Sequence, residues 1–281
     1  MTQIDFHLQL NHNDNWSMSR LHFHDYCEFL LPLTSPGNIF VNDQVYPLRR
    51  GTLYLIGENT LHRTIATGFH ARYVLHISRK ALSALSTPQT DFSRMAQSAF
   101  LRADMSNDQM ISLIERFQAL ERNKNDGAFG SDVHQAIALL DLLLQVAPIL
   151  DAATAGDAVR SKDFLRVSPI LDYIRDHLSE PLTLDLIAGQ FYLSKHYLCR
   201  IFKSATGFSV MEYIIYSRVL KARQLLKEGV SVQQAGELSG FSDNSHFIRT
   251  FGHLTGTSPG RYAREHQGSD AAPILGAGLK E

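Results

Sequence analysis

The chain has 281 residues and a formal net charge of −1, and its length suffices for two domains of ordinary size. The longest apolar runs are interrupted by Asp141 and Gln145, and the N-terminus lacks the basic start and apolar stretch of a signal peptide. We therefore expect no membrane span and no leader, and a cytoplasmic protein. Cys27 and Cys199 lie far apart, which argues against a disulfide scaffold and a cysteine-rich zinc site.

The first part of the chain is rich in short β-type stretches. Between about residues 6 and 77, segments such as Phe29 to Leu31 and Leu53 to Ile56 alternate with turn residues such as Asn42-Asp43 and Gly51. This pattern predicts an antiparallel meander that closes into a small barrel or sandwich.

Two amphipathic helices are predicted after the strands. Ser106 can cap the first, which carries apolar residues at helical spacing, and Ser131 can cap the second, which runs to about Val146. The second is apolar around much of its circumference, so we expect it to pack against the strands and against a second subunit in a homodimer.

A small, polar, aperiodic segment after Leu150 is typical of a linker. The sequence therefore predicts an α+β protein with a sensing and dimerisation domain at 1–150, a linker at 151–163, a helical domain at 164–266 and a disordered tail at 267–281. Residues 1–160 carry 13 Lys and Arg against 16 Asp and Glu, whereas residues 161–267 carry 13 against 10. This mild asymmetry agrees with a helical domain that faces DNA.

An internal repeat lies in the helical domain. A shift of 49 residues pairs identical residues at six positions within 14, among them Arg200 with Arg249 and Gly207 with Gly256. Upstream the shift becomes 48, which pairs Thr183 with Ser231, so one turn is a residue longer.

Each copy of the repeat reads as a short helix, a turn and a longer helix. Thr183 and Ser231 can cap the short helices, and Ser194 and Asp243 the longer ones. The candidate DNA contacts are outward positions of the longer helices: Lys195, His196, Cys199, Arg200 and Lys203 in the first copy, and Asn244, Ser245, Ile248 and Arg249 in the second. Arginine and asparagine read base edges in the major groove and lysine neutralises phosphate, so two such helices could read adjacent segments of a duplex. The alternative is that these are only the polar faces of surface helices.

The same residues resemble the AraC/XylS family of bacterial transcriptional regulators. The resemblance lies in Gly240-Phe241-Ser242-Asp243, Phe247-x-Arg249-x-Phe251 and Gly256-x-Ser258-Pro259-x-x-Tyr262, and covers nearly all of residues 164–265. It implies promoter DNA and RNA polymerase as partners. Two positions depart from the family pattern: Gly252 replaces a basic residue, and Gly236 replaces alanine. We expect the first to remove a phosphate contact and the second to cost about 1 kcal/mol in helix propensity.

A second constellation lies in the β-rich part, where His22-x-His24-x-x-x-Glu28 is followed by His62. The residue types and spacing resemble a cupin metal site, and the segment resembles the cupin-like sensor of the AraC/XylS family, which implies effector binding without metal. Three interpretations remain open: His22, His24, Glu28 and His62 bind a small effector with Tyr54, they bind a divalent metal ion, or they are structural. A carbohydrate is the candidate effector, because Tyr26, Tyr54 and Phe40 could stack on a sugar.

Together these features predict a sequence-specific regulator, an activator, that responds to a small molecule and needs no cofactor. We expect it not to be an enzyme. The alternative is a metal-dependent cupin enzyme, or a metal- or sugar-binding module, whose helical domain binds a partner.

Overall fold

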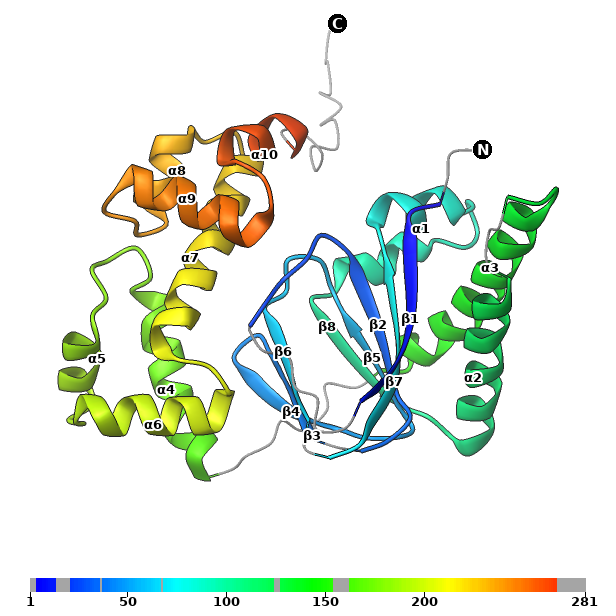
Figure 1. The fold of residues 1–281 in the computed structure, drawn as a ribbon, viewed down its shortest axis with the longest axis horizontal. Coiled ribbons are helices and arrows are strands. Elements are labelled where there is room, and N and C mark those ends of the chain that lie inside the picture. The colour runs from blue at the N-terminus through cyan, green and yellow to red at the C-terminus, as the bar shows by residue number, and fades with distance from the viewer. Residues whose placement is uncertain are drawn as a thin grey trace, which may run out of the picture. The chain divides into compact units, whose positions relative to one another are not determined.

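The computed structural model describes residues 4–13, 21–35, 37–66, 68–123, 127–153 and 162–266, and the chain divides into two compact units near residue 168 (Figure 1). The first unit combines two antiparallel sheets with helices, and the second is helical. The predicted α+β class is therefore confirmed. Most of the predicted linker and the whole predicted tail lie outside the described residues, so the proposed domain boundaries stay predictions.

Among the described residues, eight strands form the two sheets of the first unit. A five-stranded sheet has the order β1-β7-β2-β5-β8, and a three-stranded sheet the order β4-β3-β6. The turn between β3 and β4 is made by Asn42 and Asp43, whose φ values of 43° and 66° suit a tight hairpin. The strands are β1 (Phe6–Asn13), β2 (Cys27–Pro32), β3 (Gly37–Val41), β4 (Gln44–Leu48), β5 (Thr52–Ile56), β6 (His62–Ala66), β7 (His70–Ile77) and β8 (Phe100–Asp104).

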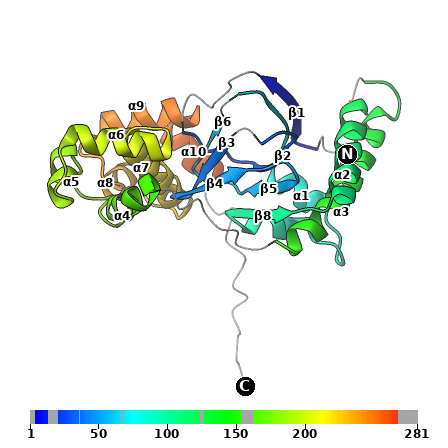
Figure 2. The ribbon, with the colours of Figure 1, turned by 90° about the horizontal axis from the view of Figure 1, so that it is seen from below.

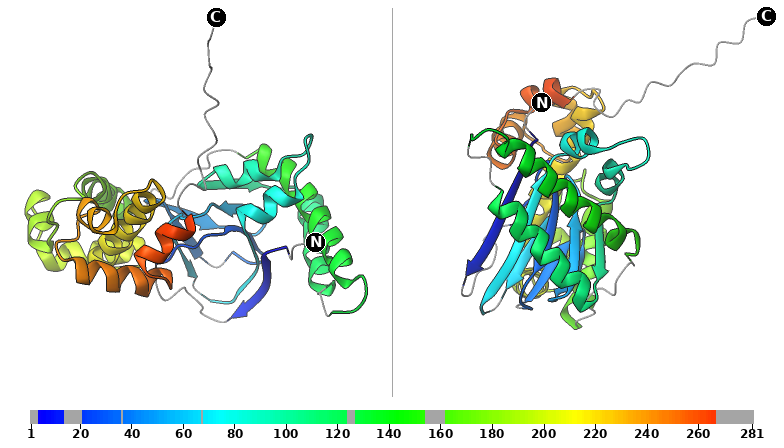
Figure 3. Two further views of the ribbon diagram at one scale, coloured as in Figure 1. Left: turned by 90° about the horizontal axis from the view of Figure 1, so that it is seen from above. Right: turned by 90° about the vertical axis from the view of Figure 1, so that its right-hand side faces the viewer.

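One face of the five-stranded sheet packs against helices. In the right-hand view of Figure 3, α2 (Asn107–Arg122) and α3 (Ser131–Asp151) lie across the strands. Phe29 and Leu75 of the sheet share a buried cluster with Phe117 of α2 and Leu142 of α3. The shorter α1 (Arg79–Leu85) and the 3-10 helix η1 (Phe92–Gln97) complete this core. The predicted pair of amphipathic helices is thus confirmed.

The two helices begin differently. Ser106 caps α2 as predicted, and its reciprocal hydrogen bonds with Gln109 form a capping box. The predicted cap at Ser131 is wrong: Ser131 is the first helical residue, and the N-cap is Gly130, at φ 81°, with no side-chain hydrogen bond. By length and composition α3 could also span a membrane, yet seven of its side chains are buried in the core, as in a globular domain.

The other face of the five-stranded sheet bears a second buried cluster. Because side chains alternate along a strand, Glu28 and Leu30 of β2 point away from the helices, on the face opposite to Phe29. Leu30 packs there with Tyr54, Val74 and residues of β3, and Glu28 pairs in register with Ile56 and His76. This places the carboxylate at the end of an apolar interior.

The second unit contains seven helices among its described residues. They are α4 (Lys162–Asp176), α5 (Leu184–Gln190), α6 (Lys195–Thr206), α7 (Val210–Lys227), α8 (Val232–Leu238), α9 (Asn244–Thr255) and α10 (Pro259–His266). In Figure 1, α7 joins the group α4 to α6 to the group α8 to α10, and Figure 2 shows the same helices from below. The repeat is visible in the lengths: α5 and α8 have 7 residues each, and α6 and α9 have 12 each.

Candidate functional site

Each copy of the repeat forms a helix-turn-helix with the predicted caps. The side chains of Thr183 and Ser231 accept hydrogen bonds from the third residues of α5 and α8. Ser194 accepts from the backbone of Tyr197 at 3.2 Å, and Asp243 accepts from His246. Side-chain caps therefore fix the start of all four helices.

The two turns use the same backbone geometry with different residues. The N–H groups of Leu193 and Phe241 donate to carbonyls five residues earlier, at 2.9 and 3.0 Å. The residue before each of them is left-handed: Tyr192 has φ 54° and Gly240 has φ 97°. Glycine takes this conformation without strain, whereas tyrosine does so at a cost of about 1 kcal/mol.

The turn of the second copy lies against the loop that follows α4. Arg218 of α7 donates from Nε to the carbonyl of Leu178 at 3.1 Å and from a terminal nitrogen to the carbonyl of Glu180 at 2.8 Å. A Cβ atom on Gly240 would lie 2.3 Å from the same Leu178 oxygen. Arg218 and Gly240 thus hold the two copies in one packed unit.

The candidate DNA contacts lie on open faces. On α6, Lys195, His196, Arg200 and Lys203 are exposed and Cys199 is half-buried. Lys195 pairs with Asp185 of α5 at 2.9 Å, and the Arg200 guanidinium lies 5.2 Å from the centre of the Tyr197 ring.

On α9, Asn244, Ser245, Ile248 and Arg249 are all exposed. The opposite sides of the two helices are buried through Leu198 and Phe202 on α6 and Phe247 and Phe251 on α9. Both polar faces are therefore open to solvent.

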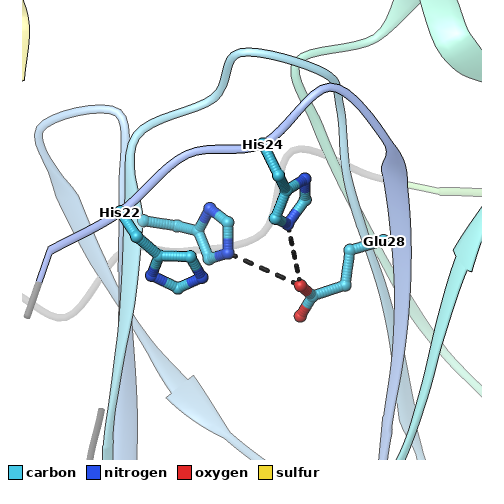
Figure 4. Close-up of side chains that lie close together, drawn as sticks. His22, His24 and Glu28 are labelled. Carbon is cyan, nitrogen blue, oxygen red and sulfur yellow. Dashed lines mark hydrogen bonds and ion pairs between the residues drawn. The ribbon is translucent and has the colours of Figure 1, made fainter. Parts of the chain in front are cut away.

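In the first unit, the structure brings His22, His24, Glu28 and His62 together. One nitrogen or oxygen atom from each lies within 4.8 Å of those of the others. The backbones of His22 and His62 form a two-way β-bridge, with N–O distances of 3.1 and 3.0 Å, and Asn59 donates to the carbonyl of His24. These bonds align the segment that carries His22 and His24 with the start of β6, so that the side chains converge on Glu28 (Figure 4).

Glu28 is the centre of the cluster. Its Oε2 atom lies 3.0 Å from Nε2 of His24, 3.5 Å from Nε2 of His62 and 2.9 Å from Nε2 of His76. Burial opposes ionisation of this carboxyl, but its contacts with the three histidines outweigh burial and hold the pKa of Glu28 well below its usual range. Burial also lowers the pKa of His22 to about 3, so this ring is neutral.

The strand β7 supplies a residue that the sequence motif does not contain. His76 lies opposite Glu28 in register and reaches the same carboxylate oxygen. The signal was the period of two along β7, which puts Arg72, Val74 and His76 on one face with Glu28.

Tyr54 lies outside this cluster, and its role in the predicted effector site stays a prediction. It is fully buried beside Leu30, and its hydroxyl donates to the carbonyl of Pro47 at 2.6 Å and accepts from the N–H of Arg49 at 3.0 Å. These bonds satisfy the phenol, so Tyr54 is a residue of the apolar interior. Phe40 is also fully buried, whereas Tyr26 is exposed near His76.

Comparison with known proteins bears on both units. A family model described as a helix-turn-helix domain matches residues 187–265. The transcriptional regulator YfiF of Bacillus subtilis is 27% identical over 86% of this chain and 78% of its own length. The transcriptional activator RhaS of Salmonella arizonae is 26% identical over 90% of this chain and 89% of its own.

The helix-turn-helix match and the regulators aligned along nearly the whole chain confirm the predicted resemblance to the AraC/XylS family of transcriptional regulators. Among solved structures, fatty-acid-bound ToxT of Vibrio cholerae aligns with 97% of the chain and 100% of its own, at 15% identity and a TM-score of 0.37, a likeness too weak to bear on ligand or mechanism.

The two departures from the AraC/XylS pattern have different structural settings. A Cβ atom on Gly236 would lie 2.8 Å from the ring of buried Phe247, so glycine here makes room for the packing of α8 on α9. The expected cost of Gly236 in helix propensity is therefore accompanied by closer packing of α8 against Phe247 of α9. Gly252 lies on the outward side of α9, where a Cβ atom would make only an ordinary contact at 3.8 Å.

Proposed function

We propose that this AraC/XylS-family regulator is a sequence-specific activator that binds promoter DNA through α6 and α9. The observation that carries the proposal is the pair of helix-turn-helix copies, equal in helix length and capping, with polar faces exposed on both longer helices. Helices of this kind place arginine, asparagine and lysine side chains against base edges and phosphates in the major groove.

The exposed faces of α6 and α9 carry different side chains for contact with DNA. Arg200 on α6 and Arg249 on α9 stand at the same position of the repeat, and Arg200 has His196 and Lys203 one turn away on either side, whereas Arg249 has Ser245 and Gly252. More positive charge on α6 favours tighter phosphate contact by the first copy. The second copy contributes base reading through Asn244 and Arg249.

We also propose that the first unit binds a small effector at His22, His24, Glu28 and His62. Imidazole and carboxylate groups can hydrogen-bond the hydroxyl groups of a carbohydrate, and the exposed ring of Tyr26 near His76 offers a stacking surface. Activation then requires that the effector bind one arrangement of the protein on DNA more tightly than another. RNA polymerase is the proposed partner on the promoter.

The test of DNA reading is substitution of the two equivalent arginines. Arg200→Ala and Arg249→Ala should each weaken binding to the cognate promoter by about 1–3 kcal/mol and relax the base preference at one position, which a randomised-site selection measures. Arg175→Ala on α4, an exposed arginine paired with Asp172, is the control and should change neither. Unchanged affinity and preference in both test variants would refute the assignment.

A further inference from the structure

In the cluster of His22, His24, Glu28 and His62, the hydrogen bonds of two imidazole rings define which nitrogen atoms carry protons. Nδ1 of His62 lies 2.8 Å from the carbonyl oxygen of Thr60, and Nδ1 of His24 lies 3.0 Å from that of Tyr26. A carbonyl oxygen only accepts, so each Nδ1 donates its N–H. In the neutral tautomer, Nε2 of each ring then carries a lone pair rather than a proton.

These two lone pairs point at a carboxylate oxygen. Nε2 of His24 and of His62 lie 3.0 and 3.5 Å from Oε2 of Glu28. Nε2 of His62 is fully buried and makes no hydrogen bond to any described residue. Lone pairs facing a buried anion repel it, and two protonated rings in contact, with centroids 4.9 Å apart, would repel each other. A cation among these atoms removes both penalties.

The donor set and its surroundings suit a transition metal. Three imidazoles and one carboxylate are ligands that zinc, nickel, cobalt and ferrous ions accept. Donor atoms about 2.1 Å from one ion lie at most about 4.2 Å apart, and the four atoms here lie within 4.8 Å, so small side-chain movements suffice. Histidine ligands characteristically donate their second N–H to a carbonyl, as His24 and His62 do.

We infer that His22, His24, Glu28 and His62 bind one divalent transition-metal ion, and that His76 orients the Glu28 carboxylate by a hydrogen bond from outside the ligand set. The inference deepens the proposed function, because the ion lies in the proposed effector site. It differs from the metal-free effector binding that family resemblance implies. The ion gives the effector a charged anchor at one end of an otherwise apolar interior.

The test is metal binding by the full-length chain. After removal of metal with a chelator, titration with Co²⁺ should give one equivalent bound per chain, seen by calorimetry and by the visible absorption of histidine-bound cobalt, and Zn²⁺ should displace it. His24→Gln and Glu28→Gln should each weaken Co²⁺ binding by more than about 100-fold, whereas His76→Gln should keep one equivalent and weaken it about 10- to 100-fold. His12→Gln, an exposed histidine on β1, is the matched control and should bind as the unaltered chain does.

Two results would overturn the inference: no saturable Co²⁺ binding by the unaltered chain, or equal binding by the unaltered chain and His24→Gln. Circular dichroism of each variant separates a lost ligand from a lost fold, and His24, which is partly exposed, is the substitution that the fold tolerates best. Promoter binding without metal binding would refute this inference alone, and metal binding without promoter binding would refute the proposed function alone.

Discussion

Replacing Gly240 by alanine tests how the second helix-turn-helix is held in place. Gly240 has φ 97°, and a Cβ atom there would lie 2.3 Å from the Leu178 carbonyl oxygen, about 1 Å inside ordinary contact. The left-handed conformation costs about 1 kcal/mol for alanine. Relief of the clash displaces the carbonyl and weakens its hydrogen bond from Arg218, worth about 1.5–3 kcal/mol for a charged donor. We expect Gly240→Ala to destabilise the unit by about 2.5–4 kcal/mol.

A second glycine in the same unit is the control. Gly256 ends α9 at φ 74°, and a Cβ atom there would meet nothing within 4 Å. Gly256→Ala should therefore cost only the backbone term, about 1 kcal/mol. Urea unfolding of each full-length variant, followed by circular dichroism at 222 nm, gives the denaturation midpoint of the helical unit, and the midpoints of Gly240→Ala and Gly256→Ala are compared. Equal midpoints would refute the steric argument.

Two further substitutions test the surfaces. Gly252→Lys should add one phosphate contact, because its side chain has open space on α9, and should steepen the slope of log affinity against log salt by about 0.9, measured by fluorescence anisotropy with promoter DNA; an unchanged slope would place Gly252 away from the duplex. Joint Ile137→Asp and Leu144→Asp on α3 should convert a homodimer into monomers in analytical ultracentrifugation, since both side chains are exposed and apolar. A monomeric unaltered chain at micromolar concentration, with and without DNA, would contradict this dimerisation.

The helix-turn-helix copies could be predicted because their signals are local. Each cap is a single residue type whose side chain bonds to the helix that follows it, and Thr183, Ser194, Ser231 and Asp243 all act as expected. The predicted cap at Ser131 is wrong because Gly130, in the left-handed conformation, is the N-cap, so that the helix begins one residue earlier than expected. Only the backbone conformation distinguishes these cases.

The cluster around Glu28 could be predicted only in part from the sequence. His22, His24 and Glu28 are near neighbours in sequence, and the β-bridge to His62 confirms their convergence. His76 joins through strand pairing with β2, a long-range contact with no spacing rule. The effector role of Tyr54 stays a prediction, and the sequence could not show that its hydroxyl bonds to the backbone of Pro47 and Arg49, because these contacts depend on the fold.

Two different recognition helices in one polypeptide would give a DNA-bound chain a fixed orientation along the duplex. A dimer of identical recognition helices binds an inverted repeat, and a half-turn rotation leaves that complex unchanged. In this chain, α6 and α9 follow each other along one polypeptide and present different side chains. Under the proposed binding mode, the matching DNA is therefore asymmetric, and a chain bound to it points one way along the duplex. An activator of this design can face only one of two divergent genes from a given site.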